Sequence, residues 1–224
     1  AQVTLKSADL NKKYDGTALK NGDNALETES GFAEGEGATY EFTGSQTVVG
    51  SSPQRVQLHA ERGHQGRQLY HYEVRGTLTV TNRDAKYEIE VESNSAEFTY
   101  DGNEHMAEGF KTLDFTVDGN EYTVSGLSAS VSGTDAGTYS NAIAGTAKVV
   151  DASDNDVTDQ FSVTTESGSL VINKAKATIA PKDATKAYDG TDLKASEFVT
   201  EGFVKDQGVK SATFTGSQLN VGTS

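Results

Sequence analysis

Residues 151–159 carry the side chains best suited to metal binding in this chain. Oxygen-bearing residues recur at alternating positions, which is the pattern that Ca²⁺ prefers, and the candidate ligands are Asp151, Ser153 and Asn155. The common twelve-residue calcium loop also requires a glycine at position six and a glutamate at position twelve, where this chain has Asp156 and Ser162. The alternative, a polar hairpin loop that holds no ion, is therefore the favoured interpretation.

Catalytic chemistry has little support in the sequence. The chain has no cysteine and no Gly-x-Ser-x-Gly nucleophile motif. His105 is the one histidine outside residues 54–72, and a serine–histidine–aspartate arrangement around it is conceivable. A surface histidine beside a turn is the simpler interpretation. We expect no catalytic residues and no enzymatic activity.

Composition excludes several classes of partner. The chain has 224 residues and a formal net charge of −14, which argues against binding to nucleic acid or to an anionic membrane surface. Without cysteine it has neither disulfides nor thiolate metal sites. No run of about 18 apolar residues is present, so we expect no membrane insertion. A hydrophobic content of 34% without tryptophan favours several small cores over one large core.

The local pattern predicts an all-β fold with at most short helical turns. Apolar and polar residues alternate with a period of two, as at Leu78 and Val80 and again at Ile89 and Val91. Asp-Gly and Gly-Asn pairs supply turn signals between such stretches. Only residues 107–113 and 193–198 have a composition compatible with a helical turn.

Internal repeats organise the chain. Tyr14-Asp15-Gly16-Thr17 recurs as Tyr188-Asp189-Gly190-Thr191, and a variant, Tyr100-Asp101-Gly102-Asn103, lies between them. The stretches 42–46 and 214–218 both read Phe-Thr-Gly-Ser-Gln, and closing strands are expected at 76–80 and 168–172. We infer a first repeat over 1–83, a related middle repeat over 84–174, and the first half of another repeat, truncated, over 175–224.

The Tyr-Asp-Gly motif is interpreted as structural. Glycine permits a positive φ in a tight turn, and aspartate hydrogen-bonds the backbone two residues further on. The three tyrosines are expected to bury their rings and keep a solvated hydroxyl. A binding role for them is the less favoured alternative.

Residues 54–72 differ from the rest of the chain because they hold three of its four histidines and three of its five arginines. Residues 54–59 can be encoded CAA CGC GTT CAG CTA CAC, and a shift of one base then reads Asn-Ala-Phe-Ser-Tyr-Thr. A compatible codon choice continues this frame as NAFSYTLNEGTKADNYTI and a final threonine, which equals the 19 residues replaced. We interpret residues 54–72 as a frame-shifted stretch. A divergent loop is the alternative.

Together, the repeated Tyr-Asp-Gly turn, the Phe-Thr-Gly-Ser-Gln stretch and the closing strand resemble the Tyr-Asp-Gly-type repeat domains of large bacterial surface adhesins. The resemblance covers nearly the whole chain except 54–72. It implies tandem small β-sandwich or β-grasp-like domains arranged as an elongated rod, outside the cell on a gut-type or Gram-positive bacterium, anchored through other regions. It carries no catalytic residues over to this chain.

The expected function is that of a stalk or spacer, or of a weak multivalent adhesive module for host glycoprotein or glycan such as mucin. The expected partners are neighbouring repeats of the same protein. The alternative is a carbohydrate-binding accessory module of a secreted glycan-degrading enzyme, which would need an exposed aromatic platform. No cofactor is expected apart from the Ca²⁺ considered above.

Overall fold

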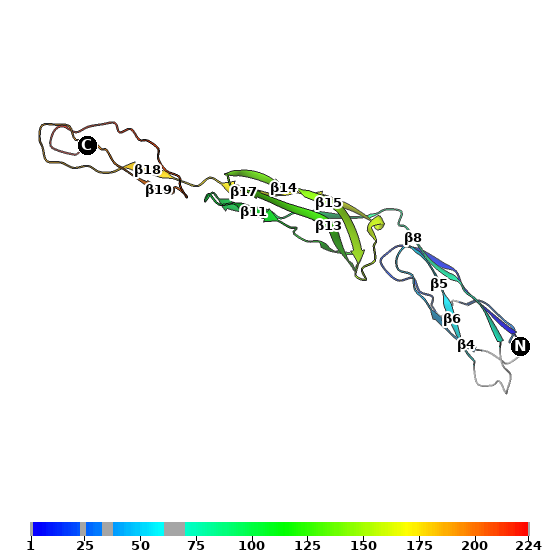
Figure 1. Ribbon diagram of the computed structural model, residues 1–224. Coiled ribbons are helices and arrows are strands. Elements are labelled where there is room, and N and C mark those ends of the chain that lie inside the picture. The colour runs from blue at the N-terminus through cyan, green and yellow to red at the C-terminus, as the bar shows by residue number, and fades with distance from the viewer. Residues whose placement is uncertain (1, 23–25, 33–37, 61–69, 224) are drawn as a thin grey trace. The chain divides into compact units, whose positions relative to one another are not determined.

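The computed structural model describes residues 2–22, 26–32, 38–60 and 70–223, and these residues form an almost entirely β structure (Figure 1). The strands are β1 (Gln2–Ser7), β2 (Leu10–Lys13), β3 (Leu26–Ser30), β4 (Ala38–Thr43), β5 (Gly50–Pro53), β6 (Arg55–Ala60), β7 (Tyr70–Val74), β8 (Thr77–Thr81), β9 (Tyr87–Glu92), β10 (Ala96–Thr99), β11 (His105–Glu108), β12 (Asp114–Val117), β13 (Asn120–Gly133), β14 (Gly137–Asn141), β15 (Ile143–Asp151), β16 (Phe161–Glu166), β17 (Gly168–Asn173), β18 (Thr178–Pro181) and β19 (Phe198–Glu201). The predicted all-β class is confirmed.

Helical structure is confined to one short 3-10 turn, Thr158–Gln160, within the described part of the chain. The helical turns considered at 107–113 and 193–198 are wrong. Ala107 lies in β11, where it is paired with Val131 of β13 and buried, so sheet pairing overrides the local propensity. Leu193 instead forms an isolated bridge with Gln218. No helix in the described residues is long and apolar enough to cross a membrane.

Contacts divide the chain into two compact units. The first comprises residues 1–91, 112–127 and 145–165, and the second comprises residues 92–111, 128–144 and 166–224. Each unit thus takes part of the middle repeat, and the three-repeat division stays a prediction from the sequence.

In the first unit, the first repeat forms small sheets in the orders β3-β1-β7, β2-β8-β5 and β4-β6. Its first strands run parallel to its last strands: β1 pairs with β7, and β2 pairs with β8 through Leu10 and Leu78. Leu5, Leu78 and Val80 are almost fully buried. The alternation seen in the sequence therefore marks the inward face of these strands correctly.

The middle repeat uses the same pairing plan. Strand β17 lies between β10, to which it is parallel, and β14, to which it is antiparallel, just as β8 lies between β2 and β5. Leu170 and Ile172 of β17 are buried against half-buried Tyr100 and Tyr139. Strand β13 pairs with β11, β12 and β15, and β16 pairs with β9. The third repeat contributes the β18–β19 hairpin.

One buried corner occurs in both repeats with the same atoms. Ser7 Oγ accepts a hydrogen bond from the Gly76 amide at 2.7 Å, and Ser93 Oγ accepts one from the Gly168 amide at 2.7 Å. Both serines are buried. A Cβ on either glycine would collide with backbone oxygens of the opposing strand end. The opposing backbone thus comes too close to leave room for a side chain at this position, and only glycine fits there.

Position 54 is where the two corners differ. The Gln54 amide donates to Gly76 O at 2.8 Å, and Asn141 is in register with Gly168, so the two residues are equivalent. Asn141 is fully buried and its Nδ2 donates to Asn94 O at 2.9 Å, which leaves only its Oδ1 unpaired. Gln54 is 1% exposed, and neither polar atom of its side chain has a partner among the described residues.

The shifted reading frame places asparagine at position 54. An asparagine there would match Asn141, whose amide is hydrogen-bonded, so the unpaired amide of Gln54 supports that frame at this residue. A buried, unsatisfied amide costs about 1–3 kcal/mol. Residues 61–69 of the segment lie outside the described residues.

We therefore expect Gln54→Asn to increase the free energy of unfolding by about 1–3 kcal/mol, because the shorter amide can take up the bond that Asn141 makes. Urea unfolding checks this. The matched control, Asn141→Gln, should lower stability by a similar amount. Equal or lower stability of Gln54→Asn would contradict the proposed equivalence.

Candidate functional site: the Tyr-Asp-Gly turns

The three motifs fold into the same turn. In each, the aspartate Oδ1 accepts a hydrogen bond from the backbone amide two residues further on: Thr17 to Asp15 at 2.9 Å, Asn103 to Asp101 at 2.8 Å, and Thr191 to Asp189 at 2.9 Å. The glycines that follow have nearly equal positive φ angles, namely 78° at Gly16, 73° at Gly102 and 77° at Gly190. The predicted structural role of aspartate and glycine is confirmed.

A lysine two residues before the tyrosine closes the turn in the first and third repeats. Lys12 Nζ lies 2.6 Å from Asp15 Oδ1, and Lys186 Nζ lies 2.8 Å from Asp189 Oδ1. The side-chain hydrogen bond from Lys186, together with bonds from Thr191, lowers the pKa of Asp189. These carboxylates are committed to the turn and stay ionised well below neutral pH.

The middle repeat replaces this lysine by Phe98 and recruits His105 instead. The His105 ring stacks on Phe98 with centroids 4.2 Å apart, and its Nε2 lies 2.9 Å from Asp101 Oδ1. The side-chain hydrogen bond from Asn103, with its backbone bond and the contact from His105, lowers the pKa of Asp101 to about 2. No hydrogen bond joins His105 to a serine hydroxyl in the described residues, and the histidine serves the turn.

Tyr14 is buried in an aromatic cluster rather than solvated at its hydroxyl. It is 1% exposed, and its Oη lies 3.4 Å from Tyr122 Oη. The Tyr122 ring meets Phe161 edge-on at 4.7 Å, and Tyr87 lies 5.4 Å from Phe161. The expected solvated hydroxyl is wrong for Tyr14, because residues more than 100 positions further along the chain cover it.

Arg83 connects this cluster to the segment between the first two repeats. Its guanidinium lies 3.7 Å from the Tyr87 ring centroid, and Nη1 donates to Tyr87 Oη at 2.7 Å and to Tyr14 O at 3.2 Å. The Arg83 amide donates to Gln160 Oε1, and Gln160 Nε2 donates to Asn82 Oδ1 at 2.7 Å. Residues 82–84, where the first two repeats join, are thus held by both backbone and side-chain hydrogen bonds.

The other two tyrosines have different surroundings. Tyr100 is half-buried, and its hydroxyl accepts a hydrogen bond of 2.6 Å from Gln207 Nε2. Lys205 Nζ donates to Gly102 O. Tyr188 is 67% exposed, so the expectation that its ring is buried is wrong. The same motif therefore takes part in different contacts according to what lies opposite it.

Burial raises the pKa of Tyr14 well above its usual value near 10, and burial with the hydrogen bond to Asp118 raises the pKa of Tyr87 to about 12. A raised tyrosine pKa stabilises the fold fully below about pH 10, and this contribution is lost as the pH rises through the folded-state value. The free energy of unfolding should therefore fall from about pH 10 upward.

We expect Tyr14→Phe to reduce this alkaline loss, because the hydroxyl that resists ionisation in the folded chain is gone. Urea unfolding at pH values between about 9 and 12 measures the slope. Tyr188→Phe, which removes an exposed hydroxyl, is the control. An unchanged slope in Tyr14→Phe would show that this hydroxyl is solvated.

The candidate calcium ligands lie at the last residue of β15, Asp151, and in the loop that follows it. Asp151 Oδ1 accepts hydrogen bonds from the Ser153 amide at 2.9 Å, the Asn155 amide at 3.0 Å and Asn155 Nδ2 at 3.1 Å. Asp156 accepts bonds from the Thr158 amide and hydroxyl. These contacts close a polar turn by themselves, and Ca²⁺ binding stays the less favoured of the two interpretations of the sequence.

We expect millimolar Ca²⁺ to leave the melting temperature unchanged, because N–H donors aimed at Asp151 oppose a cation at the same oxygen. Thermal melts with and without Ca²⁺ measure this. A rise in melting temperature that Asp151→Asn abolishes would instead establish the calcium site.

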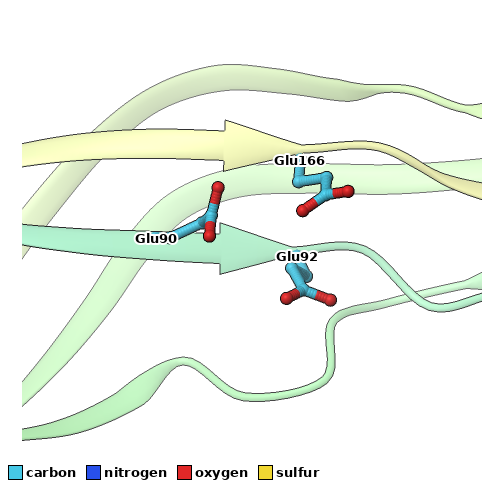
Figure 2. Close-up of side chains that lie close together, drawn as sticks. All are labelled: Glu90, Glu92 and Glu166. Carbon is cyan, nitrogen blue, oxygen red and sulfur yellow. The ribbon is translucent and has the colours of Figure 1, made fainter.

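A carboxylate cluster that the sequence did not identify lies on β9 and β16. Figure 2 shows Glu90, Glu92 and Glu166 close together, with one oxygen of each within 4.8 Å of the others. Lys111 pairs with Glu92. The alternation of glutamates along β9 was visible in the sequence, but the approach of Glu166 depends on strand pairing. Acidic clusters at the surface are common, and an ion pair with a neighbouring lysine, as here, is an ordinary surface interaction.

Comparisons with known proteins show no relationship: no family model matches the chain, and neither the curated proteins nor the solved structures give a significant match. The resemblance to Tyr-Asp-Gly-type adhesin repeats therefore stays a prediction from the motifs.

Proposed function

We propose that this chain is an extracellular repeat region of a bacterial cell-surface protein, acting as a stalk or spacer or as a weak multivalent adhesive module for host glycoprotein or glycan. The observation that carries the proposal is the recurrence of one turn and one pattern of strand pairing in the first two repeats, whose junction at residues 82–84 is held by hydrogen bonds of Arg83 and Gln160. Repeated small units joined in this way suit a spacing role.

The surface chemistry is consistent with this role. The net charge of −14 favours repulsion between copies of the chain and so disfavours non-specific association. Large exposed aromatic side chains are few in the described residues, where Phe98 and Tyr188 are the two identified. An accessory carbohydrate-binding module would need a platform of such rings, so the spacer or weak adhesin is the better proposal.

The test is binding of the full chain, with either reading of residues 54–72, to immobilised mucin and a glycan array. We expect no measurable binding by the monomer, and at most weak saturable binding when many copies are coupled to beads, because only multivalency amplifies weak contacts.

Beads blocked with an unrelated β protein are the control. Binding by the beads identifies an adhesive module, and no binding by a folded chain leaves a spacer. Tight binding by the monomer, or release of sugars from the array, would overturn the proposal in favour of an accessory module or an enzyme.

A further inference from the structure

The glycines of the three motifs share one backbone conformation but have different neighbours. Their φ angles lie between 73° and 78°. A Cβ added at Gly190 would meet nothing within 4 Å among the described residues, whereas one added at Gly16 or Gly102 would collide with side chains far along the chain. The glycine therefore suits the left-handed turn in all three motifs, and in two of them its missing side chain leaves room for a residue from far along the chain.

The first approach comes from the turn between β12 and β13. A Cβ on Gly16 would lie 2.6 Å from Asn120 Nδ2 and would also strike Tyr122 Oη. Asn120 Nδ2 donates to Asp15 O at 3.2 Å. The Tyr14 and Tyr122 hydroxyls meet beside this contact. Both sides lie in the first compact unit.

The second approach repeats the first with polar groups. A Cβ on Gly102 would lie 2.8 Å from Lys205 Cδ, and Lys205 Nζ donates to Gly102 O. Gln207 Nε2 donates to the hydroxyl of Tyr100, and Tyr122 meets the hydroxyl of Tyr14, the equivalent motif tyrosine. Both sides lie in the second compact unit.

Both approaches contain a residue with a positive φ at a similar distance along the chain, although Lys205 itself contacts Gly102 whereas Asp118 precedes the contacting residue Asn120 by two positions. Three residues other than glycine have a positive φ in the described chain, and two of them are Asp118 at 49° and Lys205 at 48°. Asp118 follows Tyr14 by 104 residues, and Lys205 follows Tyr100 by 105. Agreement in spacing and in a rare backbone conformation is unexpected for chance contacts.

We propose that the Tyr-Asp-Gly turn is a docking surface whose partner is a left-handed turn of the following repeat. The partner covers the side-chain-free glycine and presents a hydrogen-bonding group, tyrosine or glutamine, to the motif's tyrosine hydroxyl. The first docking site has a buried pair of tyrosines, and the second has the polar groups of Lys205 and Gln207. Consecutive repeats are then coupled in stability through this turn, whether or not the chain binds any ligand.

Double-mutant cycles on the full chain test the coupling. The first cycle pairs Gly16→Ala with Asn120→Gly in a Tyr122→Phe background, which removes the hydroxyl nearest to Gly16, and the second pairs Gly102→Ala with Lys205→Ala. Unfolding in urea is followed by tyrosine fluorescence, which no tryptophan masks in this chain. We expect each alanine to be less harmful when its partner is already truncated, by about tenfold in the unfolding equilibrium constant, or 1.4 kcal/mol.

The matched control is Gly190→Ala combined with Asn120→Gly, which has the same backbone strain and no contact, and we expect its effects to add. If Gly16→Ala prevents folding, Tyr14→Phe with Tyr122→Phe gives a milder cycle at the same site. Additive effects at either docking site would overturn the proposal. Because no ligand enters the measurement, this outcome is independent of the binding test above.

Discussion

The constraint on which the equivalent parts of this structure depend is a glycine in the left-handed backbone conformation, which follows a tyrosine and an aspartate that closes the turn. The aspartate takes the backbone amide two residues on, so the turn is closed by its own atoms. With the turn closed locally, the glycine backbone is free to be approached from outside. Asn120 approaches Gly16, and Lys205 approaches Gly102.

The strand pairing places this turn where it can be used. In the first and middle repeats the strand before the motif runs parallel to the closing strand, as Leu10 with Leu78 and Ala96 with Leu170. Because the two strands run in parallel, their C-terminal ends lie side by side. The tyrosine amide then bonds the end of the closing strand, Tyr14 to Thr81 O and Tyr100 to Asn173 O. In both repeats the turn therefore lies beside the end of the closing strand, from which the chain continues into the next repeat.

One pattern of strand pairing occurs twice in the chain, which allows equivalent positions to be compared. The serine–glycine corner is the same in both, and this makes the unpaired amide of Gln54 conspicuous beside Asn141. The two repeats also contact the turn aspartate with different side chains. Lys12 pairs with Asp15, whereas His105, stacked on Phe98, contacts Asp101. Equivalent positions thus keep the geometry and vary the chemistry.

The sequence by itself determined the all-β class, the inward faces at Leu78, Val80, Ile89 and Val91, and the closure of the turn by aspartate and glycine. These depend on period-two alternation and on contacts within a few residues, which local sequence encodes. Only the tertiary structure decided that Tyr14 is buried while Tyr188 is exposed, and that Ala107 belongs to a strand. The approach of Glu166 to Glu92 was decided in the same way. These three features depend on contacts between residues far apart in the chain. The register of such strand pairs is not encoded in the neighbouring sequence.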